Sequence, residues 1–158
     1  MFRNTIAAIA LGLAPLALAG LGSAAIAGPT FTGVDGGNVA VSGYDPVSYF
    51  SGTPVQGSAQ FTVTYKGAEY RFASAENAAK FKADPAAFAP QYGGHCSWAM
   101  SRGILAPGDP TQFKIVNNRL YLNFNEQVHQ TWLKDIDGFL AKSEANWPKV
   151  PDDAKFGG

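Results

Sequence analysis

The clearest pattern in the chain is an alternation of apolar and polar residues on both sides of a two-residue turn. In the segment FTVTYKGAEYRF the turn is Lys66-Gly67, and a hairpin about it places Val63 opposite Tyr70. The same register places Phe61 opposite Phe72. Hydroxyl and charged side chains fall on the other face. The pattern therefore predicts an antiparallel hairpin with one face against a core.

A second hairpin is predicted over residues 112–124, in the segment QFKIVNNRLYLNF. Its turn falls at two asparagines, a residue type that tolerates the positive φ of a tight hairpin turn. Again one face of each strand is apolar and the other is polar. The expected apolar face consists of Ile115 opposite Leu120, Phe113 opposite Leu122, and Phe124 beyond them.

Elsewhere the apolar residues follow a helical spacing. Ser74 is a predicted N-cap for a helix that continues to about Ala83, and Asp84-Pro85 begins another short helical turn. Asp45 followed by Pro46 predicts a further short helix nearer the N-terminus.

The longest helix is predicted after the second hairpin. Asn125 is its expected cap, and it runs from Glu126 to roughly Ser143 with a broad apolar stripe at about 100° per residue. His129 falls inside that stripe, so its side chain is expected to point inward.

Together these elements predict an α+β fold, a small single domain in which two antiparallel β-hairpins pack against short helices and a C-terminal helix. Hydrophobic residues make up 46% and charged residues only 15% of the chain, which is typical of a protein with a real core. We expect a signal peptide over residues 1–27, an irregular N-terminal arm over 28–40, the domain over 41–150 and a C-terminal tail over 151–158.

The first residues have the pattern of an export signal. Arg3 supplies a positive charge, residues 6–18 are apolar, and Ala25-Ile26-Ala27 is a small-residue cleavage site. The mature chain then begins at Gly28, with cleavage after Ala19 as the alternative. Because the apolar stretch is too short for a retained transmembrane helix, we expect no stable membrane insertion after cleavage. The periplasm is the expected location, and secretion is the alternative.

The charge balance excludes one class of partner. The chain has 12 basic and 12 acidic side chains, so its formal net charge is zero. Loss of Arg3 with the leader makes the charge about −1. A chain without basic excess lacks the electrostatic footprint of a nucleic-acid-binding protein, and we expect no nucleic-acid partner.

The only cysteine, Cys96, lies in the segment PQYGGHCSWAMSRG. A lone cysteine in an exported chain has no internal disulfide partner. We expect a helix with Gly94 as N-cap that continues through Met100, so that Cys96 is its second residue. Free N–H groups and the helix dipole at that position favour a thiolate, which reacts with electrophiles and binds soft metals. The alternative is a buried, inert cysteine that fills a core.

Three further side chains are candidate metal ligands beside Cys96. Met100 lies four residues after Cys96, so both sulfurs would share one helix face. His95 and His129 offer imidazole nitrogens, and burial of His129 favours its neutral form. Thiolate, thioether and imidazole together suit a soft transition metal, copper(I) above all. Each candidate also has a structural interpretation, with Met100 as core filler and His129 as a satisfied core histidine.

Motifs of established catalytic classes do not occur in the chain. The sequence contains no Ser-His-Asp order, HExxH, CxxC, P-loop or GxGxxG. The predicted caps account for Asp45 and Asp84, and Asp152-Asp153 lie in the tail. Paired-carboxylate chemistry therefore has little support, and the sequence leaves open whether the protein is an enzyme.

Several segments together resemble a known family. SGYDPVSYF, FTVTYKGAEYRFASAENAAKFKADPAAFAPQYGGHCSWA, RLYLNFN and ANWPKV are similar to the exported YHS domain-containing (seleno)proteins, over about residues 41–150. The resemblance implies a small α+β unit associated with metal handling. It also implies that selenocysteine stands at the position of Cys96 in some members, which favours a functional cysteine.

The chain departs from this family in two places. Metal-associated YHS modules usually carry additional cysteines around the hairpin and the helix after it, whereas YRFASAENAAKF has none. A cysteine-rich metal site is therefore not expected. The exported branch often has Tyr before the cysteine, where this chain has His95, a further ligand candidate.

The leading hypothesis is an exported module that binds a soft metal, with copper favoured, through Cys96, His95, Met100 and His129. Its partners would be a metal donor or acceptor protein. One alternative is a thiol redox protein that uses Cys96 with an external thiol protein, because the chain has no resolving cysteine. The other is a non-catalytic interaction domain with a structural cysteine.

Overall fold

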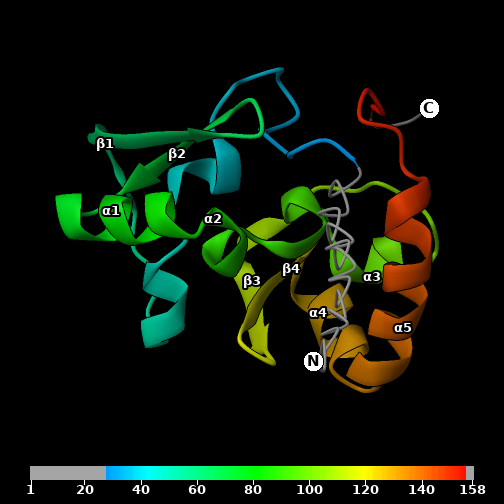
Figure 1. The fold of residues 1–158 in the computed structure, drawn as a ribbon. Helices are drawn as coiled ribbons and strands as arrows, with labels where there is room; N and C mark the ends of the chain where they lie inside the picture. The colour runs from blue at the N-terminus through cyan, green and yellow to red at the C-terminus, as the bar shows by residue number, and fades with distance from the viewer. Residues whose placement is uncertain (1–27, 156–158) are drawn as a thin grey trace, which may run out of the picture.

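The computed structural model describes residues 28–155; the predicted signal peptide, residues 1–27, lies outside the described residues. In this described part of the chain the β structure consists of two separate two-stranded antiparallel sheets (Figure 1). The first pairs β1 (Ser58–Tyr65) with β2 (Ala68–Phe72), and the second pairs β3 (Asp109–Val116) with β4 (Arg119–Asn123). The α+β class is therefore confirmed.

Short helices cover these hairpins. The α-helices are α1 (Ala75–Ala83), α2 (Pro85–Phe88), α3 (Ser97–Met100), α4 (Glu126–Trp132) and α5 (Ile136–Asn146). Among residues 28–155 there are also four 3₁₀ helices: η1 (Ala40–Gly43), η2 (Ser48–Ser51), η3 (Gln91–Gly94) and η4 (Trp147–Lys149). No helix within residues 28–155 has the length and apolar character needed to cross a membrane.

The first hairpin has the predicted register near its turn. Val63 pairs with Tyr70. The predicted pair of Phe61 with Phe72 is wrong, because the register shifts between Ser58 and Thr62 and Phe72 pairs with Ser58. Such a bulge places extra residues of β1 opposite β2, which the alternation alone does not reveal.

The second hairpin also has its predicted pairs, Ile115 with Leu120 and Phe113 with Leu122. Phe124 does not extend the apolar face, since it is 48% exposed. The expected polar second face is also wrong for β4, because α3 and α4 pack there. Tyr121 and Asn123, which alternate with the inward leucines, are consequently buried as well.

Side-chain caps define most helix starts as predicted. Ser74 Oγ accepts a hydrogen bond from Asn77 N at 3.1 Å, and Asn125 Oδ1 accepts one from Val128 N at 2.9 Å. Asp84 caps α2 through Ala87 N. These are local signals, because the capping oxygen and its donor are three residues apart.

The predicted long helix over Glu126–Ser143 is in fact two helices. The chain leaves α4 after Trp132 and begins α5 at Ile136, with Asp135 as a new N-cap that accepts from Gly138 N at 3.1 Å. A Cβ atom at Gly138 would collide with the Asp135 carboxylate. The aspartate followed three residues later by glycine is therefore the local signal for the break.

Asp45 has a larger role than the predicted cap. The N-cap of η2 is Val47, and Asp45 is a fully buried carboxylate. Its Oδ1 accepts from Val47 N at 2.9 Å, and its Oδ2 accepts from Ala73 N at 2.9 Å and from Asn77 Nδ2 at 2.7 Å. One carboxylate thus joins η2, the end of β2 and α1.

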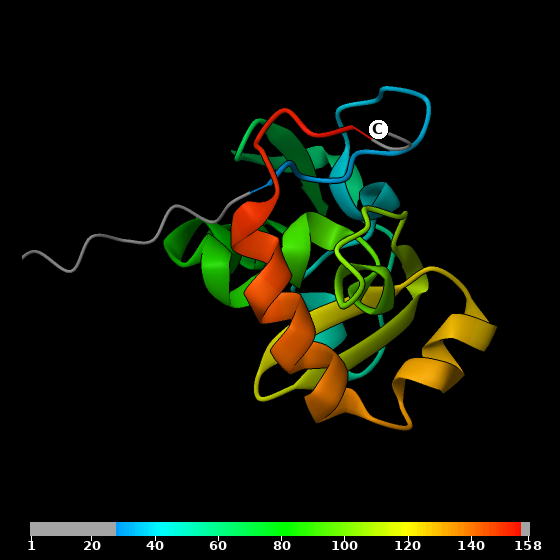
Figure 2. The ribbon, with the colours of Figure 1, turned by 90° about the vertical axis from the view of Figure 1, so that its right-hand side faces the viewer.

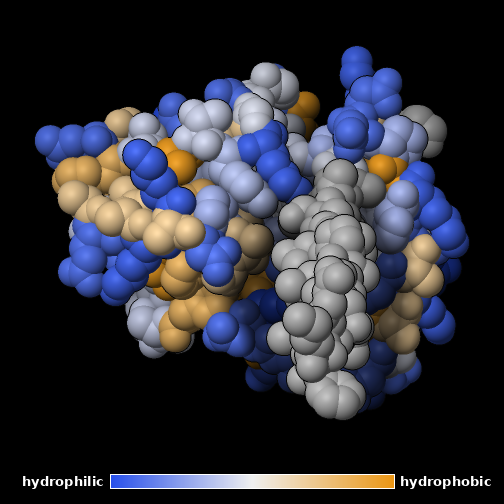
Figure 3. Space-filling model, viewed as in Figure 1, coloured by the Kyte–Doolittle hydropathy of each residue, from blue (hydrophilic) through white to orange (hydrophobic). Residues whose placement is uncertain are grey.

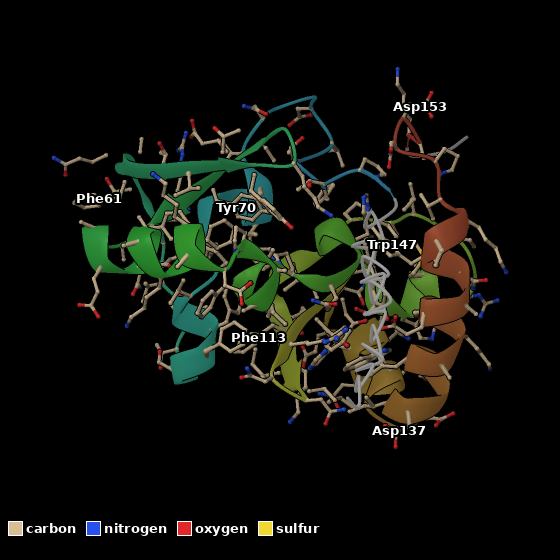
Figure 4. All side chains as sticks on the ribbon, viewed as in Figure 1. Phe61, Tyr70, Phe113, Asp137, Trp147 and Asp153 are labelled. Carbon is tan, nitrogen blue, oxygen red and sulfur yellow. The ribbon has the colours of Figure 1, made fainter. Side chains whose placement is uncertain are left out.

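The buried apolar side chains of the described residues form two clusters. The first lies between the β1–β2 hairpin, α1 and β4, and includes Tyr70, Phe72 and Phe81. The second surrounds Met100 and includes Trp132 and Trp147. Figure 1 shows α5 along one side of the molecule, the side that faces the viewer in Figure 2, and Figure 4 labels Tyr70 in the first cluster and Trp147 in the second. In Figure 3 hydrophobic residues gather over α1 and α2, whereas the C-terminal segment is largely hydrophilic.

Candidate functional site

Cys96 begins the short helix α3 rather than lying inside it. The predicted helix from Gly94 is wrong, because His95 has an extended backbone with φ −72° and ψ 160°, which separates the turn ending at Gly94 from α3. Cys96 is the N-cap of α3, which starts at Ser97. Its backbone N donates to Ala106 O at 2.9 Å, and it bridges to Leu122 of β4.

The sulfur of Cys96 lies in the interior. Cys96 is 0% exposed, and burial raises the pKa of its thiol. Backbone N–H groups of Ala99, Phe124 and Trp98 act in the opposite direction on this pKa, but burial is the larger effect. The predicted thiolate is therefore wrong for the folded protein, in which the cysteine is a neutral thiol.

Asn123 joins Cys96 to His129. The Cys96 thiol donates to Asn123 Oδ1 at 3.8 Å, and Trp98 N donates to the same oxygen at 3.2 Å. At the other end of the carboxamide, Nδ2 donates to His129 Nδ1 at 3.1 Å. Thiol and imidazole thus face the same amide from opposite sides, and this amide lies between them.

His129 is on α4 and is half-buried. Burial, and secondarily the charge of Lys114, lowers the pKa of its imidazole. The ring is stacked on Trp132 with centroids 6.3 Å apart. Because Nδ1 accepts the Asn123 hydrogen bond, the neutral ring carries its proton on Nε2. The structure places the side chain toward the interior, as the apolar stripe predicts.

His95 is turned toward the N-terminal arm. Its Nε2 donates to the carbonyl oxygen of Pro29 at 3.1 Å, and its ring lies 5.7 Å from that of Phe31. The side chain is 2% exposed, and burial lowers its pKa to about 4. His95 is therefore neutral at physiological pH and holds the arm.

Met100 lies in the second apolar cluster and is fully buried. Its backbone N donates to Cys96 O at 3.0 Å, one turn of α3 away. The residues packed around this cluster are mainly aromatic: Tyr92, Tyr121, Trp132 and Trp147. This environment is typical of a methionine that fills a core.

Within residues 28–155 there is no group of three or more His, Cys, Asp or Glu side chains that could hold an ion. Asn123 brings together one thiol and one imidazole, those of Cys96 and His129. Such a pair fits only an ion that accepts soft ligands and a low coordination number, as copper(I) does.

Asn123 was not among the residues predicted for the site. It lies at the end of β4, 27 residues after Cys96, and its amide is fully buried. A polar residue two positions before a helix cap gives no signal that a helix packs over it. Only the burial of both faces of β4 shows why a carboxamide is needed there.

Two surface cavities lie away from this network, on either side of η2. The larger has a volume of about 660 Å³ and the smaller about 480 Å³. Phe50 lines both, and none of Cys96, His95, Met100 and His129 lines either. Val47, Asn77, Lys80 and Phe88 are among the residues that line the larger cavity.

Comparison with known proteins gives one match. Residues 45–92 match the family model of the YHS domain. The matched segment ends at Tyr92, before His95 and Cys96, and contains neither cysteine nor histidine. All residues that line the larger cavity fall within it. No curated protein and no solved structure matches the chain significantly.

Proposed function

Because this chain contains a YHS domain, we propose that it is an exported binding module for a soft transition metal, copper(I) first. Cys96 is the anchoring ligand and His129 the second donor. The observation that carries the proposal is that one carboxamide, that of Asn123, is bonded to both the Cys96 sulfur and the His129 Nδ1. His95 and Met100 are outside this ligand pair, since His95 holds Pro29 and Met100 lies among aromatic rings.

Both donors are hydrogen-bonded to the Asn123 carboxamide, the Cys96 thiol at its oxygen and His129 Nδ1 at its nitrogen. The His129 Nδ1 lone pair already points at the Asn123 N–H, and a lone pair that accepts a proton donor can equally face a cation. Burial raises the pKa of the Cys96 thiol, and the backbone N–H groups of Ala99, Phe124 and Trp98 oppose part of that rise. They would stabilise the thiolate once its proton has been lost.

Metal binding at this place has two costs. The Cys96 thiol must release its proton to solvent, and the Asn123 side chain must move from between the two donors. Since the thiol pKa is raised, protons compete strongly with the metal. His129 is already neutral and adds no proton to this competition near pH 7. One proton should therefore be released for each Cu(I) bound.

The test is a Cu(I) titration of the exported protein under anaerobic conditions, in competition with a chromophoric Cu(I) chelator. We expect one bound ion, an apparent Kd that rises about tenfold per unit fall in pH, and loss of binding in Cys96→Ser. His129→Gln should weaken binding by about 10-fold or more, and Met100→Leu should leave it unchanged. Binding that survives Cys96→Ser would overturn the proposal.

A second function is supported by the burial of Cys96 and by the position of the larger cavity. A sulfur that is 0% exposed suits a structural role, and the larger cavity is lined wholly by residues of the matched YHS segment. Under this alternative the protein is a non-catalytic interaction domain that binds its ligand beside η2. Absence of Cu(I) binding, with ligand-induced chemical shift changes at Phe50 and Phe88, would favour it.

The redox alternative has less support than metal binding or the interaction-domain function. A low-pKa, accessible thiolate is what thiol redox chemistry requires, and Cys96 is buried with a raised thiol pKa. In the proposed function the protein works in the periplasm, with secretion as the alternative. Its partner would be a protein that donates or accepts the metal.

A further inference from the structure

The two ends of the described chain meet at Asp152. The backbone N of Gly28 lies 3.3 Å from Asp152 Oδ1, across 124 positions of sequence. Figures 1 and 2 both show the start of the N-terminal arm beside the C-terminal segment. The Asp152 carboxylate also acts on Lys66 in the β1–β2 turn, where it raises the amine pKa against a larger lowering by burial. Asp152 thus lies where three segments meet.

Residue 28 has room for glycine alone. Its φ is 83°, a conformation that other residues rarely adopt. A Cβ atom there would lie 2.6 Å from Cζ3 and 2.9 Å from Cζ2 of Trp147, whose ring is buried. Trp147 is labelled in Figure 4 at the end of α5. Gly28 therefore packs directly against the Trp147 ring, and this packing places its nitrogen beside the C-terminal segment.

The arm after Gly28 is part of the fold. Phe31 N donates to Gly93 O at 2.8 Å, and His95 Nε2 donates to Pro29 O at 3.1 Å. A Cβ atom at Gly93 would collide with the Pro29 carbonyl oxygen. The arm therefore lies directly on the turn that leads to Cys96.

Gly28 is also the first residue after the predicted cleavage site, Ala25-Ile26-Ala27. A signal peptidase would hydrolyse the Ala27–Gly28 peptide bond with one water. Ala27 leaves as a carboxylate, and the Gly28 nitrogen takes up a proton and becomes an α-ammonium. We propose that this new ammonium forms an ion pair with Asp152, so that processing itself fastens the arm to the C-terminal segment.

The proposal depends on cleavage at this bond and not on what the module binds. Before cleavage Gly28 offers Asp152 one neutral N–H donor. After cleavage the same nitrogen carries a full positive charge and three donors, and the hydrogen bond becomes charge-assisted. Asp152 is exposed, so the gain is small and decreases with salt.

The test begins with the intact mass of the protein exported from the full-length gene, which should start at Gly28. In that protein Asp152→Asn should lower the melting temperature by about 1–4 °C at low salt and by less at 1 M salt. Asp153→Asn is the matched control and should change the melting temperature little.

Insertion of Ala-Ser-Ser between Ala27 and Gly28 moves the ammonium about 10 Å along the chain. The effect of Asp152→Asn should then fall by at least half.

Three results would overturn the proposal. One is a mature protein that starts elsewhere, such as at Gly20 after cleavage behind Ala19. Another is an equal effect of Asp152→Asn with and without the inserted residues. The third is no effect of Asp152→Asn in the protein that starts at Gly28. None of these results bears on Cu(I) binding at Cys96, so the two proposals fail separately.

Discussion

The thiol of Cys96 donates to the side chain of Asn123, 27 residues later in the chain, at 3.8 Å. The only cysteine of the sequence therefore faces a buried amide and not solvent. The same amide binds His129 on α4, so three elements that are separate in sequence depend on one side chain: α3, β4 and α4.

Asn123→Ala should therefore destabilise the protein by about 2–4 kcal/mol, because Trp98 N–H and the Cys96 thiol lose their acceptor and His129 loses its donor. Urea-induced unfolding measures this loss. Gln130→Ala, an exposed change on the same helix as His129, should cost less than about 0.5 kcal/mol. Equal losses for the two variants would show that the Asn123 network does not stabilise the fold.

The Cys96 thiol should react slowly in the native protein. Burial raises its pKa and excludes the reagent, so the native alkylation rate should be at least about 100-fold below that of the urea-unfolded chain. The native rate should also still be rising at pH 9. Iodoacetamide labelling followed by mass spectrometry measures both. A native rate that levels off below pH 8 would instead indicate an activated thiolate.

Stability should fall as pH decreases from about 6.5 toward 4. The folded-state pKa of His95 is about 4, against an ordinary value of 6.5, so between these values the unfolded chain binds a proton that the folded chain does not. Between a pH above 6.5 and a pH below 4, this proton uptake lowers the free energy of unfolding by about 3 kcal/mol in total. His129, whose pKa is also lowered, acts in the same direction. His95→Gln should make the free energy of unfolding depend less on pH between 6.5 and 5, and His129→Gln should have a smaller effect of the same kind. If His95→Gln leaves the pH dependence unchanged, His95 is not its main source.

Asp45→Asn should be strongly destabilising although the two side chains have nearly the same shape. The carboxylate accepts three hydrogen bonds in the interior, and an amide presents two donors where acceptors are needed. We expect a loss of about 3 kcal/mol by thermal or urea unfolding. Asp84→Asn is the matched control, because asparagine caps a helix as well as aspartate does. A similar small effect in both variants would show that Asp45 acts only as a local cap.

Local features of the fold could be predicted from the sequence. Hairpin turns and helix caps depend on residues two to four positions apart, and the caps at Ser74, Asp84 and Asn125 were predicted correctly. The break after Trp132 has an equally local signal in Asp135 and Gly138, which the broad apolar stripe obscured.

The candidate site depended on contacts that a single sequence does not encode locally. Cys96 is buried because β4 and the 106–107 segment lie against it, and Asn123 is its partner because α3 and α4 cover the second face of β4. The prediction of a thiolate at a helix start was wrong because these distant segments bury the sulfur. The helix is short, and removal of the sulfur from water outweighs the nearby N–H groups.

The most direct test of the proposed metal site is copper K-edge X-ray absorption of the exported protein loaded with one equivalent of Cu(I). We expect one sulfur and one imidazole nitrogen around copper. The sulfur should be lost in Cys96→Ser and the imidazole in His129→Gln. A spectrum with only nitrogen and oxygen neighbours, or one that Cys96→Ser leaves unchanged, would contradict the account and leave Cys96 a structural residue.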